Sequence, residues 1–116
     1  MIRLASLALA GMLAAMPVTA QPVTLINVFE VPEGKLPEAI TYWEASRAFL
    51  ATQPGFIRTR LHQSIAPNAR FQLINVAEWD SPQSFQAASA RMQQEVRVPA
   101  PEGLRFVPGL YRIIRE

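Results

Sequence analysis

Two asparagines and one tryptophan are the residues of this chain whose types and positions could do chemistry together. Asn27 lies in residues 25–30 (LINVFE) and Asn75 in residues 73–78 (LINVAE), so both share the pattern LINV-x-E, and Trp79 follows the second copy. A carboxamide offers hydrogen-bond donors and an acceptor, and an indole offers one N–H donor on a large apolar ring. We therefore expect these three side chains to orient a bound molecule by hydrogen bonding.

Stronger catalytic groups are scarce. The chain has no cysteine, which excludes thiolate nucleophiles, disulfides and cysteine-based metal centres. Its one histidine, His62, alternates with Arg58 and Arg60, which places it toward solvent or a subunit contact. The two arginines could bind an anionic substrate or be solvated charges on an edge strand. No general base accompanies the asparagines on their side of the strands, although a base within hydrogen-bond reach is expected of such a site.

The elements that position these residues follow from apolar patterning. The two LINV segments are short apolar runs, which indicates inner strands of one sheet. Polar alternation after residue 56 indicates an edge strand, and Pro108 confines the last strand to the other edge. We predict strands at about 23–31, 56–65, 71–79 and 105–115, helices from 36 to about 52 and from Ser81-Pro82 onward, and an irregular loop at 93–104.

The order β-α-β-β-α-β predicts an α+β, ferredoxin-like domain with a four-stranded sheet of the antiparallel type and both helices on one face. We expect the two inner strands to be parallel to each other. Alternation then leaves Ile26, Val28, Ile74 and Val76 on the face without helices. An apolar patch of this kind marks an interface, so we predict a homodimer through the open sheet face.

The first twenty residues differ from the rest. A positive start at Arg3, an apolar or small run at 4–16 and the small residues 18–20 predict a secretory signal peptide cleaved after Ala20. The alternative is a membrane anchor, but thirteen residues fall short of the ~20 that span a bilayer. The remaining 21–116 form one domain with a net charge of +1 and no basic stripe, so neither nucleic acid nor a membrane is an expected partner. We predict a periplasmic or secreted protein.

Three runs of the sequence resemble a known family. INVFEVPEG, PGFIRTRLH and RFQLINVAEWDSPQSFQAA, with Glu78, Trp79, Ser81 and Phe85 as the most recognisable piece, resemble the antibiotic biosynthesis monooxygenase (ABM) domain family of dimeric α+β barrels. The resemblance covers about residues 24–88 in detail. It implies either a cofactor-independent oxygenase of a small aromatic or a haem-degrading enzyme.

The resemblance also implies roles for particular residues. In haem-degrading relatives a strand Asn and a strand Trp line the cavity, at the positions of Asn27 and Trp79, but the helix position of the iron ligand is Ser89 here. Serine cannot replace imidazole as an axial haem ligand. The oxygenase alternative needs no cofactor, because an electron-rich phenol, hydroquinone or anthrone can itself reduce dioxygen once deprotonated. We expect Asn27 and Trp79 as catalytic residues, with a small aromatic or apolar substrate held by Asn75, Phe29, Trp43 and Phe85.

Simpler explanations exist for the same residues. The two asparagines could satisfy buried backbone groups or water, and Trp79 could be an ordinary core residue. The domain could then be a binding or structural module without catalysis.

Overall fold

A computed structural model describes residues 21–116, so the expected leader at residues 1–20 lies outside the described part of the chain. All six expected elements are present, most of them somewhat shorter than the patterns predicted. Their order is β1 (Val23–Glu30), α2 (Leu36–Leu50), β2 (Phe56–Gln63), β3 (Leu73–Trp79), α3 (Pro82–Glu95) and β4 (Arg105–Tyr111). The fold is the predicted ferredoxin-like α+β arrangement.

The sheet has the strand order β2-β3-β1-β4, with β1 and β3 inside and β2 and β4 at the edges, as predicted. All three strand pairs are antiparallel, including β1 with β3, so the expectation of parallel inner strands was wrong. The crossover through α2 makes β1 and β2 parallel, but β3 lies between them. Because the hairpin connection of residues 64–72 reverses the chain after β2, β3 is antiparallel to both neighbours.

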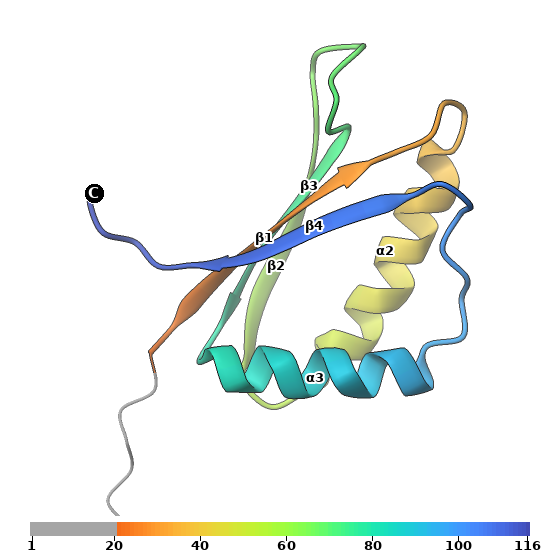
Figure 1. Cartoon of the computed structure of the whole chain (residues 1–116). Helices are drawn as coiled ribbons and strands as arrows, with labels where there is room; N and C mark the ends of the chain where they lie inside the picture. The colour runs from red at the N-terminus through yellow and green to blue at the C-terminus, as the bar shows by residue number, and fades with distance from the viewer. Residues whose placement is uncertain (1–20) are drawn as a thin grey trace, which may run out of the picture.

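Both helices lie on one face of the sheet, and they diverge from each other instead of packing side by side (Figure 1). Helix α3 begins where the sequence predicted, because the Ser81 hydroxyl accepts a hydrogen bond from the Ser84 backbone N–H at 3.1 Å. Helix α2 has a proline in its first turn and ends at Leu50, before Pro54-Gly55. The irregular loop between α3 and β4 is residues 96–104, so the expected loop at 93–104 starts three residues too early and residues 93–95 belong to α3.

The core is divided into two clusters under the helices. One cluster contains Leu25, Ala77, Trp79 and Ala88, and the other contains Phe29, Ala39 and Leu73. Along β1 and β3 the two clusters are separated by one inward-facing position on each strand, and these positions are Asn27 and Asn75. The polar pair therefore lies where the apolar core is interrupted.

One inward-facing residue of β2 differs from the prediction. Strict alternation along β2 would put Ile57 on the same side as Thr59 and Leu61. Instead, Phe56 pairs with Trp79 and Arg58 with Glu78, so Ile57 is the extra residue of a β-bulge. Ile57 is consequently exposed, and Phe56 packs against the core in its place. From Thr59 onward the alternation holds, with Thr59 and Leu61 on the helix side.

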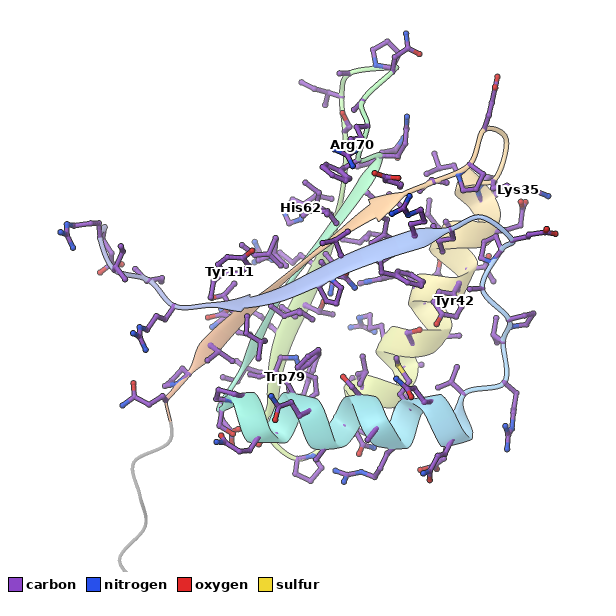
Figure 2. The ribbon with its side chains drawn as sticks, in the orientation of Figure 1. Lys35, Tyr42, His62, Arg70, Trp79 and Tyr111 are labelled. Carbon is purple, nitrogen blue, oxygen red and sulfur yellow. The ribbon has the colours of Figure 1, made fainter. Side chains whose placement is uncertain are left out.

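The other face of the sheet carries no helix among residues 21–116 (Figure 1). Ile26, Val28, Ile74 and Val76 lie on it and are only partly buried, as the alternation predicted. Figure 2 shows His62 and Tyr111 on this side and Trp79 and Tyr42 on the helix side. Arg58 forms an ion pair with Glu78 there. No helix within the described residues is long and apolar enough to cross a membrane.

Candidate active site

A cavity of about 330 Å³ lies between the sheet and the two diverging helices. Its lining includes all six residues that the sequence and the resemblance singled out: Asn27, Phe29, Trp43, Asn75, Trp79 and Phe85. They come from β1, α2, β3 and α3, so four separate elements bring them together. The cavity falls in the usual size range of small-molecule sites, near its lower end.

Aromatic rings form a large part of the cavity wall. Seven of the ten aromatic residues of the chain line it, namely Phe29, Tyr42, Trp43, Phe56, Trp79, Phe85 and Phe106. Several hold one another edge to face: Trp79 with Phe56 at 5.4 Å between ring centroids, and Phe29 with Phe106 at 5.1 Å. Such pairs fix ring positions beyond what burial alone would do. The wall is therefore pre-formed and suits a flat apolar molecule.

Trp79 is at once a core residue and a lining residue. It is only 1% exposed and belongs to the cluster of Leu25, Ala77 and Ala88. Phe56 and Phe85 both contact its ring edge to face. The simpler explanation that Trp79 packs in the core is thus correct as far as it goes, and it leaves room for the ring to form one wall of the cavity.

The two asparagines are direct cross-strand partners at the centre of the sheet. Asn75 is buried, and its side-chain oxygen accepts a hydrogen bond from the Thr59 hydroxyl at 2.5 Å. Because that oxygen is committed to Thr59, the amide nitrogen is the group that Asn75 can offer to a bound molecule. Thr59 thereby sets which end of the Asn75 amide faces the cavity.

Asn27 is in the opposite situation. Its side-chain oxygen is buried and has no hydrogen-bond partner within the described residues. Its cross-strand neighbour on β4 is Pro108, which has no polar side chain and no backbone N–H. A buried acceptor without a donor is unfavourable by about 1–3 kcal/mol, and a hydroxyl on a bound molecule would relieve that cost. No backbone group among the described residues donates to this oxygen, so that part of the simpler explanation does not apply to Asn27.

Four exposed residues line the open side of the cavity: Arg47, Gln93, Phe106 and Pro108. Arg47 is the one charged residue of the lining, and no Asp, Glu or His is among the lining residues. The sequence did not single out Tyr42, Ser46, Arg47 or Thr59 for the site. Ser46 follows Trp43 at helical spacing, which was an available signal, whereas Thr59 required knowledge of its strand neighbour.

A haem does not fit the residues of this site. Ser89 lines the cavity where haem-degrading relatives are expected to carry the iron ligand, and a hydroxyl is no substitute for imidazole. His62 lies on the opposite face of the sheet (Figure 2). Within residues 21–116 no group of three or more His, Asp or Glu side chains is placed to hold a metal ion.

Solved structures of three known proteins have a similar fold. A proposed monooxygenase from Shewanella loihica PV-4 is 52% identical, with a TM-score of 0.78 over 85% of this chain and 100% of the other. The cofactor-independent oxygenase SnoaB from Streptomyces nogalater is 28% identical, with a TM-score of 0.69 over 84% and 97% of the two chains. The heme-degrading protein Rv3592 from Mycobacterium tuberculosis is 25% identical, with a TM-score of 0.57 over 84% and 96%.

A comparison with curated proteins found no match. The family model described as antibiotic biosynthesis monooxygenase matches residues 22–95, which include β1 through α3 and most of the cavity lining. This match covers more than half of the chain, and the Shewanella protein is similar over nearly all of the described residues. The chain therefore belongs to the antibiotic biosynthesis monooxygenase family.

Proposed function

We propose that this protein is a cofactor-independent monooxygenase that oxidises a small electron-rich aromatic with dioxygen in the cavity between sheet and helices. The observation that carries the proposal is the cavity itself: an aromatic wall surrounding a pair of amides at the centre of an otherwise apolar floor. The similarity to SnoaB, a cofactor-independent oxygenase, supports the same class of reaction.

The chemistry can be written with the substrate as the sole electron donor. For an anthrone-type substrate, loss of a proton to water gives a carbanion whose negative charge lies largely on oxygen. The carbon forms a bond to dioxygen, and the resulting peroxide takes a proton to become a hydroperoxide. Departure of water then breaks the O–O bond and forms a carbonyl, so one oxygen atom remains on the product and the other leaves as water.

The lining residues have separate tasks in this scheme. The Asn75 amide nitrogen, oriented by Thr59, donates a hydrogen bond to the substrate oxygen on which charge develops. The unpartnered oxygen of Asn27 accepts a hydrogen bond from a substrate hydroxyl or from the hydroperoxide. The rings of Trp79, Trp43, Phe29 and Phe85 hold the substrate and exclude water, which strengthens both hydrogen bonds.

Oxygen uptake with a panel of hydroquinones and anthrones tests the proposal. We expect uptake above the uncatalysed background with the wild type, and a decrease of about tenfold or more in kcat for Asn27→Ala, in line with the loss of one oriented hydrogen-bonding group. Asn68→Ala is the matched control, because Asn68 lies exposed in the turn between β2 and β3. If no substrate in a broad panel consumes oxygen above background, the oxygenase proposal is wrong.

A second candidate function is a binding module that holds a small apolar molecule without turnover. The absence of Asp, Glu and His from the lining favours it, because no side chain there is an obvious base. The two functions give different results in one experiment: a binding module would bind aromatics measurably and leave oxygen uptake at background.

We also propose that the protein acts as a homodimer through the open face of the sheet. Ile26, Val28, Ile74 and Val76 on that face are partly exposed in the single chain, and Val107 of the edge strand, opposite Val28, is 54% exposed. A second copy would bury this apolar surface. Analytical ultracentrifugation of residues 21–116 measures the oligomeric state directly. A stable monomer at high concentration would contradict the dimer.

Export by the leader is the remaining part of the proposal. The tripartite pattern of residues 1–20 supports cleavage after Ala20 and a periplasmic or secreted protein. The mass of the protein recovered from the periplasm of an expressing bacterium would show whether Gln21 is the first residue of the mature chain.

A further inference from the structure

Four of the ten basic residues within residues 21–116 are neutralised by a glutamate, and Arg47 is not among them. Lys35, Arg58, Arg70 and Arg105 each form an ion pair with a glutamate, and Arg91 donates to Gln53. Arg47 has neither an ion pair nor a side-chain hydrogen bond within residues 21–116. It lies in the last turn of α2 and lines the cavity on its open side.

The surroundings of Arg47 allow its charge to attract an anion. No acidic side chain lines the cavity, and the aromatic rings around it cannot screen a charge as water does. An anion that enters the cavity therefore meets one cation and no opposing carboxylate. A guanidinium presents several N–H groups in a fixed plane, which suits the oxygens of a carboxylate or a phenolate.

We propose that the cavity selects an aromatic oxyanion, and that Arg47 binds the anionic oxygen at the opening while the ring lies among the aromatic side chains. This inference rests on the proposed function and names the substrate class for the same cavity. It separates Arg47 from Asn27 and Asn75, which face the inner part of the molecule from the centre of the sheet.

The inference also accounts for the missing base. A cation beside a bound phenol or enol lowers the pKa of that ligand, because it stabilises the ionised form. The substrate can then lose its proton to water at the open side of the cavity without a carboxylate or imidazole from the protein. Arg47 thus favours ionisation of the substrate oxygen at the opening, and the conjugated ring carries part of that charge to the inner oxygen that Asn75 binds.

Binding of a matched ligand pair tests the inference without any turnover. Titration calorimetry compares 2-naphthoate with its neutral counterpart 2-naphthamide, which has nearly the same shape. We expect the wild type to bind the carboxylate about fivefold to tenfold more tightly than the amide, as befits one charged hydrogen bond at a partly exposed site. A second arm uses 2-naphthol, whose affinity should rise between neutral pH and about pH 10, where a phenol ionises.

Three variants assign the effect to Arg47. Arg47→Gln should abolish the preference for the anion and leave 2-naphthamide binding unchanged, which also shows that the cavity is intact. Arg47→Lys should retain part of the preference. Arg91→Gln is the matched control, because it removes the same charge from an exposed helix residue that does not line the cavity.

The outcomes are separable from those of the oxygenase proposal. If neither ionised ligand binds the wild type more tightly than its neutral form, or if Arg47→Gln keeps the preference, the inference is overturned even where oxygen uptake is observed. A preference shown by 2-naphthol alone or by 2-naphthoate alone supports it and identifies the anion as a phenolate or a carboxylate. Anion binding that depends on Arg47 without any oxygen uptake would sustain the inference and remove the oxygenase function.

Discussion

The inner strands β1 and β3 carry the same LINV pattern, yet their asparagines have opposite hydrogen-bonding situations. Asn75 accepts a hydrogen bond from Thr59, whereas the side-chain oxygen of Asn27 is buried without a partner. The two residues are direct cross-strand partners at the same depth of the sheet. The difference therefore cannot come from the strands themselves.

The difference between the two asparagines comes from the edge strands β2 and β4. Strand β2 places the hydroxyl of Thr59 within reach of Asn75. Strand β4 places Pro108 opposite Asn27, with Phe106 and Leu110 as the next inward-facing residues. None of these three side chains can donate a hydrogen bond. The β2 side thus holds the Asn75 amide in a fixed orientation, and the β4 side leaves the Asn27 oxygen as an unsatisfied acceptor beside the cavity.

The largest expected difference is in stability. Asn75→Ala removes a hydrogen bond and leaves the Thr59 hydroxyl without an acceptor, so we expect the free energy of unfolding to fall by about 1–2 kcal/mol. Asn27→Ala removes a buried acceptor that lacks a partner, and the relief of that cost is offset by the packing lost with the side chain, so we expect a net change within about 0.5 kcal/mol. Urea denaturation of both variants measures the two changes in the free energy of unfolding. Equal losses would mean that the two asparagines do not differ as described.

A smaller effect is expected at Thr59, which we regard as a positioning residue for Asn75. Thr59→Val keeps the shape and removes the hydroxyl, which should lower the free energy of unfolding by about 1 kcal/mol. It should also lower kcat for oxygen uptake more than it raises KM, because the Asn75 amide loses its fixed orientation at the charge that develops during reaction.

Thr59→Ser is the control, since it restores a hydroxyl and should recover most of the kcat. In a double-mutant cycle with Asn75→Ala, the two changes should couple by about 0.5–1.5 kcal/mol. Additive losses would show that the hydrogen bond contributes nothing.

Local patterns were enough to predict most of the fold. Pro54-Gly55 and Ser81-Pro82 mark helix ends by backbone chemistry that does not depend on tertiary contacts, and alternation along β3 correctly separated Leu73, Asn75 and Ala77 from Ile74 and Val76. The same alternation placed Asn27 and Asn75 on the inner face. The resemblance to the family then supplied the cavity between sheet and helices.

What local patterns could not predict depends on how distant elements meet. The direction of β3 relative to β1 follows from the crossover and the hairpin together, and apolarity alone suggested the wrong one. The bulge at Ile57 is set by the register with β3. The hydrogen bond of Thr59 joins residues 16 positions apart, and Arg47 of α2 lines a cavity whose other walls include β1, β3 and α3.

The smallest expected effect comes from giving Asn27 the partner that Asn75 already has. In Pro108→Ser a hydroxyl replaces the proline ring opposite Asn27, where it can donate to the unpartnered oxygen. The gain of a hydrogen bond, about 1 kcal/mol, is offset by the extra flexibility of the unfolded chain once proline is lost, so the net stability should change little.

The informative quantity is therefore the loss of unfolding free energy that Asn27→Ala causes in the wild type and in P108S. It should be near zero in the wild type and about 0.5–1 kcal/mol in P108S, measured by urea denaturation. Oxygen uptake should fall modestly in P108S, because a substrate hydroxyl must then compete with the serine for Asn27. If Asn27→Ala costs the same unfolding free energy in both backgrounds and oxygen uptake is unchanged, the oxygen of Asn27 is available neither to the serine nor to the substrate.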